Sequence, residues 1–175
     1  MKWFKSNILR VGATGVLLAA VLLVGCTMSY KLTGASIDPS VKTVSIAYFP
    51  NNAPLVAPIL SATLTDALQD KFARQTRLTQ VREGGDLNFE GEIIGYTSTP
   101  AQISGDEVAV MNRLTITVQV RFTNSVQPEY DYKRSFSAFG DYNSSRMLQE
   151  VEPTLIPEIV EQLVEDIFNA AVSNW

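Results

Sequence analysis

Apolar and polar residues alternate most regularly in the middle of the chain, between Val108 and Thr123. Every second residue there is large and apolar: Leu114, Ile116, Val118, Val120 and Phe122. The residues between them are polar: Arg113, Thr115, Thr117, Gln119 and Arg121. Successive side chains of a strand point to opposite faces, so this pattern predicts a long strand with one face in a core and the other in water.

Four shorter segments also have the composition or period of a strand. Residues 41–49 are rich in β-branched and aromatic residues, and their alternation with smaller or polar residues predicts a strand with one better-buried face. Residues 77–82 suit an edge strand. Residues 130–139 are the expected partner of the long strand, reached through a turn at 124–129. In residues 86–98 the predicted apolar face contains glycines, which indicates a bulge or a close approach by a helix. That face is Leu87, Phe89, Gly91, Ile93 and Gly95.

Two segments have the period of a helix. From about Val56, apolar residues recur at steps of four as far as Phe72, and Pro58 falls in the first turn, where proline is tolerated. The second segment, residues 155–172, has apolar residues at spacings of three and four. It could begin earlier, near Arg146, in which case Pro153 and Pro157 imply a kink or two successive helical pieces.

The order of these elements is strand, helix, a run of strands, and helix. Two helices with single apolar stripes must bury them, and a half-apolar sheet must cover one face. The simplest solution is an α+β fold of two layers, with two helices on one face of a mostly antiparallel four- to five-stranded sheet. We expect it to form a single domain over residues 41–175, with the polar sheet face open to solvent or to a wet partner surface.

The first 25 residues have the organisation of an export signal. A basic start with Lys2, Lys5 and Arg10 is followed by the uncharged run 11–25, which is short for a membrane span of about 20 apolar residues. We therefore exclude residues 1–25 from the fold as a removed signal peptide.

The only cysteine, Cys26, follows this run directly. "LLVGCT" is similar to the bacterial lipobox, which implies cleavage before Cys26 and a diacylglycerol on its thiol; the alternative is a buried or free thiol. Residues 26–40 would then be a lipidated tether. Two or three acyl chains hold a protein firmly on a membrane, at about 0.8 kcal/mol per buried CH2. Thr27 is not an aspartate, which is typical of lipoproteins sorted to the outer membrane.

Composition removes several functional classes. Loss of the signal changes the net side-chain charge from −4 to −7, which argues against nucleic-acid binding because that depends on Lys and Arg. The chain has no histidine, and in the lipobox interpretation its one thiol would carry lipid, so we expect no zinc site and no Cys/His nucleophile. The remaining option for catalysis is a carboxylate pair such as Glu90 and Glu92, for which a solvated strand face is the simpler interpretation. We therefore predict a protein that is not an enzyme and needs no metal or other cofactor.

Several stretches together resemble one known family. They are the lipobox at Cys26, "SIAYFPNNAPLVAPILSATLTDALQDKF", "LNFEGEIIGY", "NRLTITVQVRFTN" and "EQLVEDIFNAAVSNW". In this order they are similar to the lipopolysaccharide-assembly lipoprotein family LptE, in a divergent branch. The resemblance implies two helices on a four-stranded sheet and a protein that is not an enzyme. It further implies a lipid-anchored plug inside the outer-membrane β-barrel LptD, on the periplasmic side or within the lumen, which helps to deliver lipopolysaccharide to the outer leaflet.

Four basic residues on the two neighbouring predicted strands are candidates for binding the anionic headgroup of lipopolysaccharide: Arg113, Arg121, Lys133 and Arg134. Cations would recognise its phosphates, although ordinary solubilising charge is the alternative. The loop 100–106 could contact a barrel wall or simply connect two strands.

Other functions remain open at this point. The same features suit an adaptor lipoprotein of another envelope machine, such as a transporter auxiliary protein or a secretin pilot. An envelope enzyme using Glu90 or Glu92 is the third option.

Overall fold

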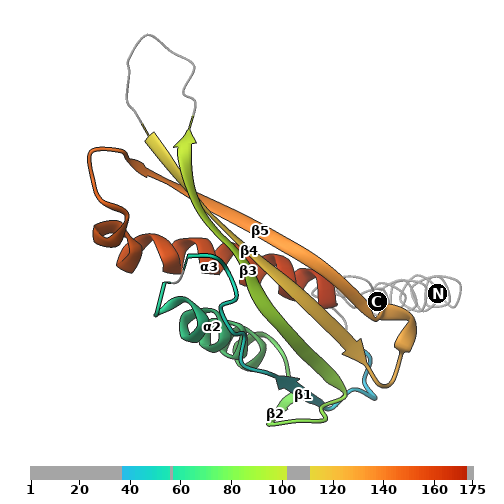
Figure 1. The fold of residues 1–175 in the computed structure, drawn as a ribbon. Coiled ribbons are helices and arrows are strands. Elements are labelled where there is room, and N and C mark those ends of the chain that lie inside the picture. Colours follow the sequence, from blue (N-terminus) through green and yellow to red (C-terminus); the bar gives the residue numbers. More distant parts are fainter. Residues whose placement is uncertain (1–36, 56, 102–110, 173–175) are drawn as a thin grey trace, which may run out of the picture. The chain divides into compact units, whose positions relative to one another are not determined.

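The computed structural model describes residues 37–55, 57–101 and 111–172 (Figure 1). The signal peptide 1–25, Cys26 and most of the tether lie outside the described residues, as does most of the loop 100–106. The elements, in chain order, are β1 Thr43–Ile46, α2 Leu60–Gln75, β2 Thr79–Val81, β3 Leu87–Ala101, β4 Met111–Asn124, a 3-10 turn at Pro128–Tyr130, β5 Tyr132–Asn143 and α3 Leu148–Val172.

The five strands form one sheet in the order β2-β1-β3-β4-β5. Strands β3, β4 and β5 are antiparallel to one another, whereas β1 is parallel to both β2 and β3. Helix α2 provides the crossover that a parallel β1–β2 pair requires. The predicted α+β fold with a mostly antiparallel sheet is therefore confirmed, apart from these two parallel pairings.

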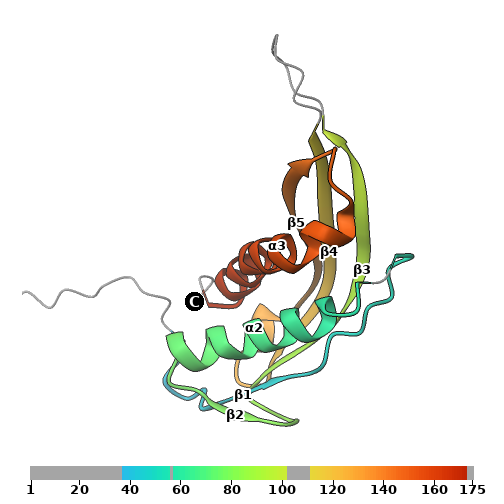
Figure 2. The same ribbon diagram turned by 90° about the vertical axis from the view of Figure 1, so that its left-hand side faces the viewer.

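Both helices cover the same face of the sheet, which curves around them (Figure 2). A row of aromatic rings crosses this core from helix to helix and then across the sheet, with neighbouring ring centroids 4.9–5.1 Å apart. The rings belong to Phe168, Phe72, Phe89, Phe122 and Tyr132. The apolar residues of β4 from Leu114 to Phe122 all face this core, as their alternation predicts.

The glycines of β3 have the two roles that the sequence leaves open. The register with β4 shifts between Ile93 and Gly95, so a bulge is present. Because of this bulge Tyr96 returns to the core, and Gly95, placed on the apolar face in the sequence analysis, does not share that face. At Gly91 a Cβ atom would collide with the carbonyl oxygen of Gln119 and would lie 2.5 Å from the ring of Phe49. The close approach at Gly91 is thus made by Phe49 rather than by a helix.

The C-terminal helix runs without interruption from Leu148 to Val172 and contains both Pro153 and Pro157. Both prolines are exposed, so the carbonyl groups that they leave without an intrahelical partner can be hydrated. Of the two alternatives raised by the prolines, two separate helical pieces are ruled out. Among the described residues, neither helix has the length and apolarity needed to cross a membrane.

Candidate functional site

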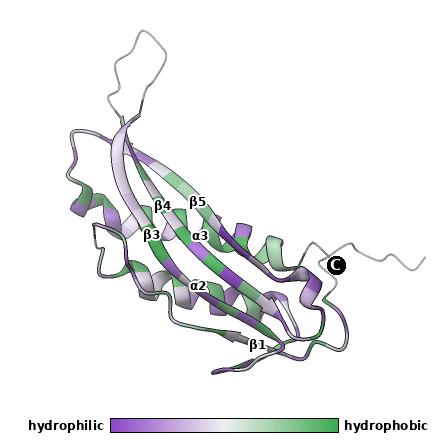
Figure 3. Cartoon of the chain, turned by 45° about the vertical axis from the view of Figure 1, so that its right-hand side comes forward, coloured by the Kyte–Doolittle hydropathy of each residue, from purple (hydrophilic) through white to green (hydrophobic). Residues whose placement is uncertain are grey.

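The sheet face turned away from the helices, here called the open face, is polar along β3, β4 and β5. Green and purple residues alternate along these strands in Figure 3, as expected when only one face is apolar. Its centre is rich in hydroxyl groups, and Thr117 and Ser137 share a hydrogen bond of 2.8 Å across β4 and β5. No described helix packs on this face (Figures 1 and 2). It is therefore a surface suited to wet, hydrogen-bonded contact.

Two of the four predicted basic residues meet on the open face. Arg121 of β4 lies directly opposite Lys133 of β5 in the strand register, and both side chains are exposed. Neither has a carboxylate within 4.0 Å among the described residues. Like charges directly opposite each other destabilise a sheet. An anionic ligand would relieve this repulsion.

Glu90 of β3 lies opposite Arg121 of β4, which lies opposite Lys133 of β5, so the three residues form a charged row across the sheet. Together with Gly91, Glu92 and Gln119 these residues line a shallow pocket of about 240 Å³. Amide groups hold the two carboxylates: Asn88 donates a hydrogen bond to Glu90 at 3.2 Å and Asn52 donates one to Glu92 at 2.5 Å. Among the described residues no group of three or more side chains could hold a metal ion.

Arg113 lies on the same face but is committed to other residues. Its guanidinium group donates two hydrogen bonds to the Asp141 carboxylate, at 2.7 and 2.8 Å, and stacks 3.7 Å from the ring centroid of Phe139. These hydrogen bonds lower the pKa of Asp141. Arg113 is eight residues from Arg121 along β4, which corresponds to about 27 Å. It is therefore outside the Arg121–Lys133 site.

Arg134 lies on the opposite side of the sheet from Lys133, because neighbouring residues of a strand point to opposite faces. Its register partner is Val120, a core residue. The guanidinium group lies 4.5 Å from the ring centroid of Tyr132 and 4.8 Å from that of Phe136. Burial raises the pKa of Tyr132 to about 12. The structure thus brings together Arg121 and Lys133 alone, and distributes the other two predicted cations elsewhere.

Negative charge is concentrated in the helix layer. All six charged residues of α3 are acidic: Glu150, Glu152, Glu158, Glu161, Glu165 and Asp166. The charged residues that face outward from β3, β4 and β5 within the described residues include three cations, Arg113, Arg121 and Lys133, and three acids, Glu90, Glu92 and Asp141. The open face is therefore less acidic than the helix layer, and two of its acids, Glu90 and Glu92, lie beside the Arg121–Lys133 site.

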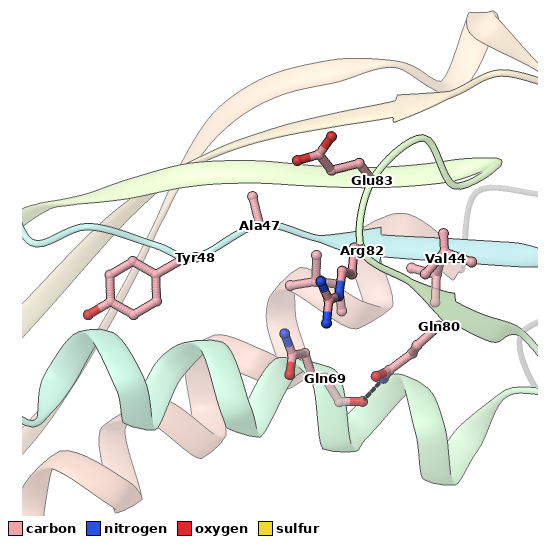
Figure 4. Close-up of a pocket in the computed structure, with 9 residues that line it drawn as sticks. Val44, Ala47, Tyr48, Gln69, Gln80, Arg82 and Glu83 are labelled. Carbon is pink, nitrogen blue, oxygen red and sulfur yellow. Dashed lines mark hydrogen bonds between the residues drawn. The ribbon is translucent and has the colours of Figure 1, made fainter.

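A second concave feature lies beside β1, where the sequence offers no signal. A groove of about 520 Å³ separates β1 and β2 from α2, with Val44, Ala47 and Tyr48 on one side and Gln69 on the other (Figure 4). The side chain of Gln80 crosses its end and donates a hydrogen bond to the Gln69 carbonyl oxygen.

Comparison with models of known protein families shows to which family the chain belongs. The family model described as "LptE: Lipopolysaccharide-assembly" matches residues 41–171, which is nearly all of the folded domain. The chain belongs to the LptE family. This family consists of assembly lipoproteins that are not enzymes, and it is associated with the lipopolysaccharide transport machinery of the cell envelope.

Two solved structures have a similar fold. A minor lipoprotein from Acinetobacter baumannii is similar with a TM-score of 0.51 and 15% identity, over 77% of this chain and 95% of that one. A hypothetical protein from Chlamydia trachomatis is similar with a TM-score of 0.53 and 10% identity, over 77% and 99% of the two chains. At these identities the likeness concerns the fold alone. No curated protein sequence matches the chain.

Proposed function

We propose that this LptE-family protein is a lipid-anchored partner of an LptD-type β-barrel in the outer membrane, and that it acts as a plug and assembly factor in lipopolysaccharide transport. The observation that carries the proposal is the family match over residues 41–171. The polar, uncovered sheet face gives it a physical basis. Barrel interiors are polar, and a face of Thr, Ser and Gln side chains can hydrogen-bond to such a wall directly or through water.

The proposed anchor is the acylated thiol of Cys26. A single acyl chain gives only marginal membrane binding, whereas two or three chains hold a protein on the membrane. Ile37 follows Cys26 by 11 residues, so this part of the tether spans at most about 40 Å when extended. The domain would therefore remain close to the membrane and to any barrel within it.

The proposed lipopolysaccharide contact is the pair Arg121 and Lys133. Arginine and lysine bind phosphate groups through charge-assisted hydrogen bonds, and these two cations have no carboxylate within 4.0 Å among the described residues. Arg113 and Arg134 are secondary candidates because aromatic rings and, for Arg113, Asp141 already engage them.

Co-purification tests the barrel partnership. The full chain, tagged after Trp175, is isolated from membranes in mild detergent, and its partners are identified and quantified by mass spectrometry. We expect one large outer-membrane β-barrel in near-equal amount, and an unrelated tagged outer-membrane lipoprotein should not retain it. Recovery of a transporter or a secretin in its place would identify an adaptor of another machine and refute the proposal.

Binding of lipopolysaccharide is tested separately with the purified chain. Replacing both Arg121 and Lys133 by Glu should weaken binding at least tenfold, because two attractive charges become repulsive. The matched control replaces Arg74 and Arg77, which are also exposed, by Glu. Equal binding by the two double variants would remove the Arg121–Lys133 pair from the mechanism, while leaving the barrel partnership to be judged by co-purification.

A further inference from the structure

Strand β5 has 12 residues, and no strand among the described residues pairs with its outer edge. Ser125 donates its backbone N–H to Asp86 on the β3 side, so odd-numbered residues of β4 bond to β3 and even-numbered ones bond to β5. The β5 partners of those even residues are also even-numbered, for example Val120 with Arg134. The backbone groups of the odd-numbered β5 residues therefore point outward: Lys133, Ser135, Ser137, Phe139 and Asp141.

All five of these residues are exposed. Among the described residues one side chain reaches this row of backbone groups: Gln162 of α3 donates a long hydrogen bond of 3.4 Å to the Phe139 carbonyl oxygen. Long, exposed edges are sites where other strands add, and proteins usually shorten or cover them. An edge of this length needs an explanation.

We propose that two copies of this chain pair through their β5 edges, antiparallel, with Ser137 of each copy on the two-fold axis. In this register Lys133 of one copy lies directly opposite Asp141 of the other, twice per dimer. Asp141 already accepts two hydrogen bonds from Arg113 of its own chain, so Lys133 of the second copy would join an existing ion pair. Each residue of the outward row exchanges backbone hydrogen bonds with its counterpart, as the antiparallel ladder requires. The arrangement is isologous and therefore closes at two copies.

The same register also matches large residues with small ones on the helix-facing side of the edge. Phe136 of one copy lies opposite Ala138 of the other, and Arg134 lies opposite Gly140. Side-chain pairs across such a ladder decide its stability. A register shifted by one step along the edge places Lys133 opposite Asn143 and Asp141 opposite Ser135, and so loses the complementary charges.

Arg134 gains a partner in this dimer. Within its own chain it stacks on Tyr132 and Phe136 and has no carboxylate within 4.0 Å among the described residues. Gly140 packs beneath Leu155 and Ile159 of α3. Glu158 lies on that turn, four residues before Gln162 and hence on the same helix face, the side that reaches the β5 edge. Arg134 of the second copy, opposite Gly140, would therefore approach Glu158.

A pairing of single strands buries less area than a standard protein interface, below about 1,200 Å² in total. We therefore expect a concentration-dependent dimer with a dissociation constant of about 1 µM or weaker. Such a dimer would occupy the exposed edge before another strand could add to it. This inference concerns self-association and does not depend on the proposed barrel partnership. In the dimer, however, Lys133 faces Asp141 of the second copy, so dimer formation would compete with the proposed lipopolysaccharide contact.

Cysteine substitution tests the register directly. In the paired state the Cα atoms of the two Ser137 residues would lie about 5.5 Å apart, within the range of a disulfide. The two Ser135 residues would be about 14 Å apart, four residues along the strand. In the full chain, purified from membranes in mild detergent without reductant, Ser137→Cys should give a disulfide-linked dimer on a non-reducing gel, and Ser135→Cys should not. The unsubstituted chain controls for Cys26.

Adding Lys133→Glu to the Ser137→Cys chain should abolish the dimer band, because Glu would face Asp141 of the second copy. Adding Arg74→Glu, the same charge change on α2, should leave the band intact. Cross-linking of both cysteine variants to equal extent would indicate random collision and overturn the proposal. The absence of any dimer, together with a monomeric mass for the unsubstituted chain by analytical ultracentrifugation, would also overturn it. A disulfide from Ser137→Cys to a different protein would show that another strand occupies the edge.

Discussion

Replacing Phe89 by Ala should be among the most destabilising single changes in this domain. Phe89 is fully buried and lies at the centre of the aromatic row, 4.9 Å from the ring centroids of both Phe72 and Phe122. Removing a buried phenyl ring loses its transfer free energy and leaves a cavity, which together cost about 3–5 kcal/mol. The cavity would lie between α2 and two strands, whose backbones cannot close around it without breaking the β3–β4 pairing.

Urea unfolding followed by circular dichroism measures this loss. We expect the free energy of unfolding to fall by about 4 kcal/mol with an unchanged denaturant slope. Phe89→Leu, which refills most of the volume, should cost clearly less. The control is Phe139→Ala, the same change at a ring that is 47% exposed on the open face, which should cost about 1 kcal/mol or less. If Phe89→Ala lost less than about 1 kcal/mol, or no more than Phe139→Ala, the packing described for this core would be wrong.

Four further predictions concern the core, acid stability, the anchor and catalysis. Val118→Asp should cost several kcal/mol, measured by thermal unfolding, because it buries a charge at a position with 0% exposure; an unchanged melting temperature would refute the strand register. The Asp86 carboxylate has a lowered pKa, first because the backbone N–H of Lys42 and then because the Thr43 side chain donates a hydrogen bond to it. The stability that this ionised carboxylate contributes is present above its unfolded-state pKa and is lost as the pH falls below about 4. Asp86→Asn should therefore flatten the acid limb of a plot of unfolding free energy against pH, and an identical acid limb in the variant would contradict this. Cys26→Ala should abolish metabolic labelling with palmitate, and retained label would defeat the lipobox interpretation. Changing Glu90 and Glu92 to Gln should leave barrel co-purification and export of lipopolysaccharide intact, whereas loss of a turnover would favour an enzyme.

The sequence predicts the fold well because each element has a clear period. The alternation from Leu114 to Phe122 and the four-residue steps from Leu60 to Phe72 determine which faces are buried, and the structure agrees. The predicted start of the first helix near Val56 is wrong: α2 begins at Leu60, so Pro58 precedes the helix and does not lie in its first turn. The parallel pairing of β1 is not encoded in any local pattern. It depends on α2 carrying the chain back, so it becomes visible only in three dimensions.

The candidate site was only partly predictable. Neighbouring residues of a strand face opposite sides of the sheet. The sequence alone is therefore sufficient to place Lys133 and Arg134 on different faces of the predicted strand. The capture of Arg113 by Asp141 could not be foreseen, because it depends on the register of β5 against β4. The bulge between Ile93 and Gly95 was likewise only partly predictable, because the glycines indicate an irregularity in the strand but not its position.

The β5 edge was also beyond sequence reasoning. Residues 130–139 are predicted to pair with the long strand, and from Tyr132 onward they do, whereas Tyr130 ends the 3-10 turn. Whether a strand lies at the edge or in the centre of a sheet depends on whether another strand pairs with its second side, and no local sequence pattern gives this. Strand order supplies that information. Once β5 is known to be an edge strand, the opposite charges at the two ends of its outward row, Lys133 and Asp141, suggest the pairing with a second copy proposed above.

Depletion in living cells tests the central claim most directly. The chain is placed under a repressible promoter, and newly made lipopolysaccharide reaching the outer leaflet is followed by surface labelling, with the unsubstituted chain supplied from a plasmid as the control. We predict that depletion stops surface delivery and lowers the amount of folded LptD-type barrel, and that the plasmid copy restores both. Normal surface delivery in depleted cells, with the barrel folded and abundant, would contradict a role in lipopolysaccharide assembly.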